Sequence, residues 1–303
     1  MKFIIYTHRF DNNSGGLVVL HYLCHLLNKL GYEAYLWPSY QAIFDIKRPF
    51  KSFLKILKYY KKELHRPFTV NKNWNTPILK NIREFEDAIV IYSEIVDGNP
   101  LQLRNSVRWL LHKPGFHSQK INFNHNEMIV GYGEKFSTKD YPVVKDNTLY
   151  LTYIMTDIYV QNNFSERFGS CHMIRKGKDK QIIHEKDSMC VDGLSHEELA
   201  EIFNKKKYFV SYDTYTFYSV YAAMCGCISI VVPDDGISKK EWHPKIEDTY
   251  GISYGVDDLK YAENTKHLMI KYIENQQKEN INSVKNFVKQ CEDYKKKKKY
   301  TFK

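Results

Sequence analysis

The stretch from Tyr208 to Pro233 constrains the fold of this chain more than any other part. Two short apolar runs, 208–212 and 227–232, have the composition of buried strands. Residues 216–224 between them have a helical pattern, and Gly226 suits the left-handed position that follows a helix end. A strand, a helix and a strand in this order form one βαβ unit of a parallel sheet.

Polar residues occupy the turn between the first of these strands and the helix. Asp213 and Thr214 are candidate caps for the helix N-terminus. Ligands of parallel sheets bind at the carboxyl ends of the strands, where the helix N-termini point. We therefore expect Asp213, Tyr215 and Thr216 to lie at a binding site.

The spacing of this unit resembles the donor-binding domain of retaining glycosyltransferases with the GT-B fold. In that family an acidic residue, seven further residues and a second acidic residue precede a small-residue helix end and a strand. Here the frame runs from Asp213 through TYTFYSV to Tyr221, followed by AAMCGCISIVV. The resemblance implies that Asp213 contacts donor sugar hydroxyls. Because Tyr221 replaces the second acid, which usually binds the ribose, retention and inversion both stay open.

Strand and helix patterns alternate along all 303 residues, which predicts an α/β protein with two Rossmann-like halves. The resemblance implies the GT-B arrangement, in which two such domains face each other across a cleft. We expect an acceptor-side domain at residues 1–155 and a nucleotide-sugar domain at residues 156–265. A helix at residues 266–293 would return to the first domain, and residues 294–303 would form a mobile basic tail.

A basic cluster follows the short apolar run that ends at Ile174. Its sequence, Arg175-Lys176-Gly177-Lys178, resembles the basic residues that neutralise the nucleotide diphosphate in GT-B donor domains. Fixed cations can stabilise the leaving diphosphate without a metal; a solvated turn is the alternative. No Asp-x-Asp motif is present, so we expect no divalent metal and no cofactor. The implied donor site comprises Arg175, Lys176, Lys178, Asp213, Tyr215, Thr216, Phe217 and Tyr221.

The loop THRFDNNSGG separates a predicted first strand from a predicted helix. Gly15 and Gly16 stand at the helix N-terminus and resemble the glycine-rich first loop of the GT-B acceptor domain, where backbone N–H groups favour an anion. A tight turn without a ligand is the alternative. His8 and Asp11 are catalytic candidates that could deprotonate an acceptor hydroxyl, and Asp11 also suits a turn or cap.

Glu94 follows a predicted buried strand at residues 87–93. The stretch 92–115 resembles an acceptor-side segment of bacterial glycan-assembly glycosyltransferases. The resemblance makes Glu94 a third catalytic candidate and Asn99 a residue of the acceptor loop. In the alternative, Asn99 only forms a turn and Arg108 lies at the surface.

A basic amphipathic helix is predicted at residues 47–66. Its apolar and basic positions each recur at helical spacing. The apolar stripe comprises Phe50, Phe53, Leu54, Leu57 and Leu64, and the basic stripe comprises Lys51, Lys55, Lys58 and Lys62. We expect the apolar stripe to pack on the chain's own sheet. The alternative is docking at an anionic membrane surface, where a lipid-linked acceptor would lie.

Composition limits the classes of protein to which the chain can belong. The net charge of +10 favours anionic partners. No apolar run of about 18 residues and no secretory signal is present, so we expect a cytoplasmic protein, or one peripheral to the inner face of the cytoplasmic membrane. The six cysteines form no C-x-x-C pair and are expected to be free thiols.

These features together predict a metal-independent glycosyltransferase. The donor would be a nucleotide sugar, and the acceptor a hydroxyl of a capsular, lipo-oligosaccharide or O-antigen glycan, free or lipid-linked. The alternatives are a nucleotide-sugar epimerase of the same fold and a non-catalytic GT-B protein that binds a glycan or a partner. No nucleic-acid-binding motif is visible, so no nucleic-acid partner is expected.

Overall fold

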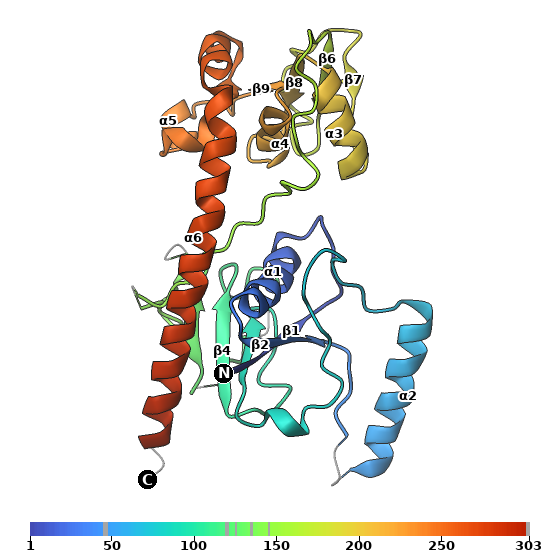
Figure 1. Cartoon of the computed structure of the whole chain (residues 1–303), viewed down its shortest axis with the longest axis vertical. Helices are drawn as coiled ribbons and strands as arrows, with labels where there is room; N and C mark the ends of the chain where they lie inside the picture. Colours follow the sequence, from blue (N-terminus) through green and yellow to red (C-terminus); the bar gives the residue numbers. More distant parts are fainter. Residues whose placement is uncertain (45–47, 119–120, 125, 134–135, 145, 301–303) are drawn as a thin grey trace. The chain divides into compact units, whose positions relative to one another are not determined.

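The computed structural model of the chain divides into two compact units (Figure 1). Unit 1 comprises Met1–Tyr153 and Gln277–Lys303, and unit 2 comprises Ile154–Gln276. Each unit contains one five-stranded sheet, and every strand pair is parallel. The predicted α/β class with two Rossmann-like halves is confirmed. The structure describes residues 1–44, 48–118, 121–124, 126–133, 136–144 and 146–300.

The sheet of unit 1 has the strand order β2-β1-β3-β4-β5. The chain therefore adds strands on one side of β1 and then on the other, and the order reverses between β1 and β3. The strands are β1 (Lys2–Thr7), β2 (Glu33–Pro38), β3 (Ile89–Ser93), β4 (Asn105–Leu110) and β5 (Met128–Gly131), and the helices are α1 (Gly15–Lys29), α2 (Pro49–His65) and a 3₁₀ turn (Arg83–Phe85).

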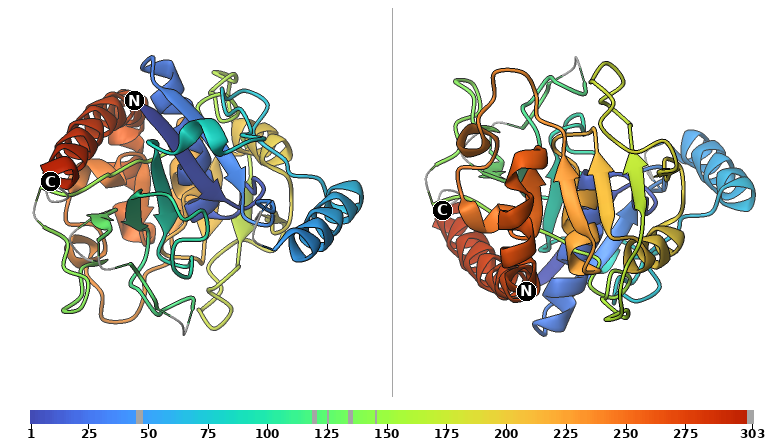
Figure 2. Two further views of the ribbon diagram at one scale, coloured as in Figure 1. Left: turned by 90° about the horizontal axis from the view of Figure 1, so that it is seen from below. Right: turned by 90° about the horizontal axis from the view of Figure 1, so that it is seen from above.

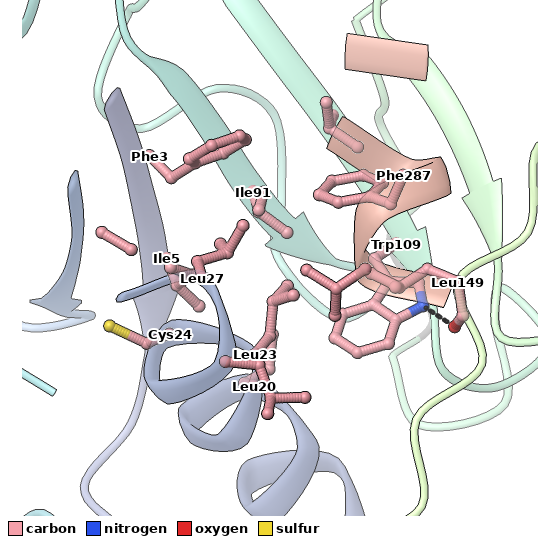
Figure 3. Close-up of a cluster of buried hydrophobic side chains, with 14 of the residues drawn as sticks. Phe3, Ile5, Leu20, Leu23, Cys24, Leu27, Ile91, Trp109, Leu149 and Phe287 are labelled. Carbon is pink, nitrogen blue, oxygen red and sulfur yellow. Dashed lines mark hydrogen bonds between the residues drawn. The ribbon is translucent and has the colours of Figure 1, made fainter. Parts of the chain in front are cut away.

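The main core of unit 1 lies between its sheet and α1 (Figure 3). Leu20, Leu23 and Leu27 recur at helical spacing on α1 and are at most 3% exposed. Burying each such side chain stabilises the fold by about 1.5–3 kcal/mol. Trp109 joins this core and satisfies its indole N–H by donating to the Leu149 carbonyl at 3.1 Å.

The sheet of unit 2 has the order β10-β9-β8-β6-β7, so its reversal lies between β6 and β8. Figure 2 shows this sheet from above. The strands are β6 (Ser170–Met173), β7 (Met189–Cys190), β8 (Tyr208–Ser211), β9 (Ile228–Val231) and β10 (Ile252–Tyr254); the helices are α3 (His196–Lys205), α4 (Tyr218–Met224) and α5 (Lys239–Trp242), with 3₁₀ turns at Ile246–Thr249 and Val256–Asp258.

The βαβ unit predicted for residues 208–233 is present as β8, α4 and β9. Gly226 follows α4 with φ 82°, as expected of a left-handed residue after a helix. The predicted caps are wrong: α4 begins at Tyr218, its N-cap is Phe217, and Asp213 and Thr214 lie before it. Their side chains are instead bound to neighbouring turns of the same sheet edge.

Helix α6 (Leu259–Tyr300) begins in unit 2 and ends in unit 1. Residues 294–300, the first part of the predicted basic tail, are helical and continue α6. Lys295 lies 2.7 Å from the Asp87 carboxylate, and Lys298 donates to the Arg104 carbonyl at 2.7 Å. These partners hold the basic residues on unit 1. Residues 301–303 lie outside the described part.

Helix α2 contradicts the expectation that its apolar stripe packs on the sheet. Phe50, Leu57 and Leu64 are 74%, 49% and 84% exposed. The helix instead contacts unit 1 through another side, on which the Glu63 carboxylate accepts a hydrogen bond from Tyr40. Residue 47, the predicted start, lies outside the described residues. None of the described helices is long and apolar enough to cross a membrane.

The six cysteines are free thiols, as predicted. Five of them are buried, and only Cys190 is exposed. Burial raises the pKa of the Cys225 thiol to about 12, so this thiol stays protonated at neutral pH.

Candidate functional site

A pocket of about 650 Å³ lies at the carboxyl edge of the unit 2 sheet. It is lined by Ile174, Arg175, Lys178 and Asp192, which follow β6 and β7. In open parallel sheets this edge, next to the reversal of strand order, is where ligands bind. The predicted basic cluster therefore contributes two of the four lining residues.

Arg175 is held in an uncommon backbone conformation, with φ 42°. The Asp192 carboxylate fixes this turn, since it accepts hydrogen bonds from Ile174 N at 2.8 Å and Arg175 N at 3.3 Å. The Arg175 guanidinium lies 5.3 Å from the centre of the Tyr218 ring, and its Nε lies 3.7 Å from Asp213 Oδ2. The side chain thus extends toward the turn after β8.

Gly177 brings the basic loop against the end of β8. A Cβ atom at this position would lie 2.2 Å from the Tyr212 carbonyl oxygen, which no side chain could tolerate. The close approach requires glycine. It places Arg175 and Lys178, on either side of Gly177, next to the turn that carries Asp213.

Lys180 connects three turns of this edge, a role that the sequence did not reveal. Its Nζ lies 2.6 Å from Asp234 Oδ1, donates to the Val232 carbonyl at 2.7 Å and contacts Thr214 Oγ1. The hydrogen bond from Lys180 lowers the pKa of Asp234 below its ordinary value. Because its partners are 34 to 54 positions away, no local pattern could have predicted them.

The other predicted donor residues differ in exposure. Tyr215 and Phe217 are exposed, Lys176 is exposed, and Thr216 Oγ1 accepts a hydrogen bond from Tyr218 N at 3.3 Å. Tyr221 is only 5% exposed, and its ring stacks on Tyr159 with centroids 4.1 Å apart. The structure therefore places Tyr221 in the interior of unit 2 and not among the pocket-lining residues.

Glu94 follows β3 in unit 1, at the reversal of that sheet. It is 7% exposed, and its Oε2 accepts a hydrogen bond from Leu111 N at 3.1 Å. Burial raises the pKa of this carboxyl above its ordinary value, while hydrogen bonds from the backbone N–H groups of Glu94 and Leu111, and then His117 and His112, act in the opposite direction. A carboxyl with a raised pKa is suited to proton transfer.

The first turn of α1 packs against Leu111, which binds Glu94. A Cβ at Gly16 would lie 3.6 Å from Leu111 Cδ1, and Leu111 is the residue whose N–H binds Glu94. A Cβ at Gly15 would meet no atom within 4 Å. Packing in unit 1 thus leaves space at Gly15, where a ligand could approach the backbone of this turn closely.

His8 and Asp11 follow β1 on the other side of the same reversal. His8 Nδ1 lies 2.7 Å from Ser39 Oγ, and burial and the Lys62 charge lower its pKa below the ordinary value. Asp11 Oδ1 accepts a hydrogen bond from Asn13 N at 2.9 Å. The Asp11 side chain therefore forms the turn that the sequence offered as its alternative role.

Asn99 and Arg108 organise the loop that follows Glu94. Asn99 accepts a hydrogen bond from the Tyr92 hydroxyl at 2.7 Å and donates to the Leu103 carbonyl at 2.8 Å. The surface position suggested for Arg108 is wrong, since it is 0% exposed and paired with Glu127 at 2.9 Å. Its remaining donors bind the carbonyls of Ser93, Val96 and Gly98.

No protein-family model matches the chain, and no curated protein is similar to it at a significant level. Among solved structures, it is similar to sucrose-phosphate synthase from Thermosynechococcus elongatus, with 11% identity, a TM-score of 0.33 and coverage of 97% of this chain and 98% of the other. The glycosyltransferase VinC in complex with dTDP matches with 11% identity, a TM-score of 0.38 and coverage of 98% and 100%.

A protein from Listeria monocytogenes assigned as a UDP-N-acetylglucosamine 2-epimerase matches with 8% identity, a TM-score of 0.36 and coverage of 92% of this chain and 90% of the other. All three TM-scores are below 0.5. The α/β class of the chain follows from its own two parallel sheets.

Proposed function

We propose that this chain is a metal-independent glycosyltransferase of GT-B type whose unit 2 binds a nucleotide-sugar donor. One observation carries the proposal. Arg175 and Asp213 follow β6 and β8, the two strands between which the order of the unit 2 sheet reverses, beside a pocket that Lys178 also lines. A cation pair and a carboxylate at this place fit a diphosphate joined to a sugar.

Each residue has a chemical role in the proposal. Arg175 and Lys178, with Lys176 nearby, bind the diphosphate and stabilise the negative charge that grows on it as the glycosidic bond breaks. Asp213 accepts hydrogen bonds from sugar hydroxyls. The backbone amides of Thr216 and Phe217 complete the phosphate contacts, as the resemblance implies.

Unit 1 is assigned to the acceptor. Glu94 is the best-supported catalytic base, because it is a buried carboxyl with a raised pKa, held by Leu111, against which the first turn of α1 packs. His8 is the second candidate. The acceptor class, a hydroxyl of a bacterial surface glycan or its lipid-linked precursor, comes from the resemblance of residues 92–115.

A ligand panel tests the donor assignment. UDP, GDP, CDP, ADP and dTDP, each with and without magnesium, are added to the full chain, and the unfolding midpoint is measured. A ligand that binds only the folded state raises the midpoint. We expect one nucleotide to raise it selectively and equally with or without magnesium. A flat response to all five would contradict a nucleoside-diphosphate site.

Turnover of the matching nucleotide sugars then separates transfer from epimerisation. A transferase releases nucleoside diphosphate in proportion to the glycosidic bonds formed with an added acceptor. An epimerase changes the configuration of the sugar while it stays attached to the nucleotide and needs no acceptor. NMR of the reaction mixture distinguishes the two products, and nucleotide binding without either reaction would indicate a non-catalytic protein.

A further inference from the structure

Helix α2 exposes a continuous apolar stripe to solvent. Its five members, spaced three and four residues apart, share one side of the helix and are Phe50, Phe53, Leu57, Tyr60 and Leu64. Each is at least 49% exposed, and Leu64 is 84% exposed. Figures 1 and 2 show that α2 projects from the rest of unit 1.

The attachment of α2 to unit 1 uses a different side of the helix. The Glu63 carboxylate accepts hydrogen bonds from the Tyr40 hydroxyl at 2.6 Å and from Phe68 N at 3.2 Å. Tyr59 packs on Tyr40 with ring centroids 5.8 Å apart, and Lys62 Nζ lies 4.1 Å from the centre of the same ring. These contacts hold the helix while its apolar stripe points away from them.

The charge around the stripe is almost entirely positive. Residues 48–66 contain seven Lys and Arg side chains and one acid, Glu63, which is bound to Tyr40 and Phe68. Lys51, Lys55 and Lys58 are exposed and share a second side of the helix at helical spacing. Among the described residues, no carboxylate lies within ion-pairing distance of these three lysines.

We propose that α2 docks unit 1 on the surface of an anionic phospholipid bilayer. The apolar stripe would enter the boundary between headgroups and acyl chains, and the long lysine side chains of α2 would reach lipid phosphates. A second copy of this chain is a poorer occupant, because it would bring the same positive charge to the interface. The proposal does not depend on glycosyl transfer, although a surface-bound α2 would hold the adjacent His8 loop near lipid-linked molecules.

Vesicle co-sedimentation of the full chain tests the proposal. We expect binding to vesicles of phosphatidylcholine mixed with phosphatidylglycerol, weak binding to phosphatidylcholine alone, and loss of binding in high salt. Two triple variants should each weaken binding by roughly tenfold or more. The first replaces three apolar residues by serine: Phe50→Ser, Phe53→Ser and Leu57→Ser. The second reverses three charges: Lys51→Glu, Lys55→Glu and Lys58→Glu. Every altered residue is exposed, so folding should be retained.

Matched controls carry similar chemical changes at exposed positions outside α2. The control for the serine variant carries Phe164→Ser, Phe168→Ser and Ile270→Ser. The control for the charge variant carries Lys260→Glu, Lys271→Glu and Lys278→Glu. Both should bind vesicles like the unaltered chain. Equal weakening by a control and its α2 counterpart would mean that overall charge or hydrophobicity causes binding, and would overturn the assignment to α2.

A fluorescent probe on the stripe reports insertion directly. Because Cys190 is the exposed cysteine, Leu64→Cys in a Cys190→Ser background can be labelled selectively with a polarity-sensitive dye. We expect a blue shift of its emission on anionic vesicles. The absence of a shift on vesicles would show that the stripe does not enter lipid. The proposal would also be overturned if the shift occurs without vesicles, rises with protein concentration and accompanies dimer formation in light scattering.

Discussion

Arg175 Nε lies 3.7 Å from Asp213 Oδ2, and the two side chains differ sharply in exposure. The Arg175 side chain is 43% exposed, whereas that of Asp213 is 7% exposed. The carboxylate is therefore fixed at the end of β8, while the guanidinium remains accessible to a ligand. In the proposed function, Arg175 contacts the diphosphate and Asp213 stays in place beside it.

Arg175→Ala should weaken nucleoside diphosphate binding by about tenfold to a hundredfold, because a charged hydrogen bond contributes roughly 1.5–3 kcal/mol. Isothermal titration calorimetry with the nucleotide found in the ligand panel measures the effect. Lys205→Ala, an exposed change on α3, is the control and should bind normally. Unchanged affinity of Arg175→Ala would reject the diphosphate contact.

Asp213→Asn should leave nucleoside diphosphate affinity intact or slightly raised, because it removes a negative charge beside Arg175. Sugar transfer should fall by roughly tenfold or more, since a carboxylate binds a hydroxyl more strongly than an amide does. Both quantities can be measured with the same donor. Asp235→Asn, at an exposed position after β9, serves as the control. A normal transfer rate in Asp213→Asn would remove Asp213 from the sugar site.

Glu94→Gln should change how stability depends on pH. The pKa of Glu94 in the folded chain is raised above the ordinary 4.5, so folding favours the protonated carboxyl. This contribution is complete below the ordinary pKa and is lost as the pH rises through the folded value. The unaltered chain should therefore lose stability relative to Glu94→Gln as the pH rises toward neutrality. Urea unfolding of both proteins checks this, and a constant difference would contradict it.

Arg108→Met should destabilise unit 1 by about 3–5 kcal/mol, because it leaves the buried Glu127 carboxylate without its cation. Adding Glu127→Met should restore part of the loss, since the uncompensated charge is then gone. Denaturant unfolding measures both. Lys205→Met, which breaks an exposed pair with Glu201, should change stability little. Additive losses in the double variant would show that the two side chains do not act as a pair.

Much of unit 2 could be predicted because its signals are local. The apolar runs of β8 and β9 are bounded by polar residues and Pro233, and Gly226 suits the left-handed position after a helix end. The position of Arg175 followed from its place after a predicted strand. The partners of Lys180 could not be predicted, because they come from two later turns that only the sheet brings together.

The wrong expectations in unit 1 share a physical reason. An amphipathic pattern shows that α2 has an apolar side, but not what covers it, and here Tyr40 and Phe68 hold a different side. A charged residue within a strand is usually placed at the surface. Arg108 is buried because Glu127 and three carbonyls compensate its charge, and none of these partners adjoins it in the sequence.

The course of α6 sets the order in which the chain can complete its cores during synthesis. Val284, Phe287 and Cys291 on the last part of α6 belong to the core of unit 1, yet they leave the ribosome after all of unit 2. Unit 2 is one continuous segment and can close first. The N-terminal unit is thus the last to be finished, and a ribosome that stops before residue 284 releases a chain whose first sheet still exposes part of its apolar face.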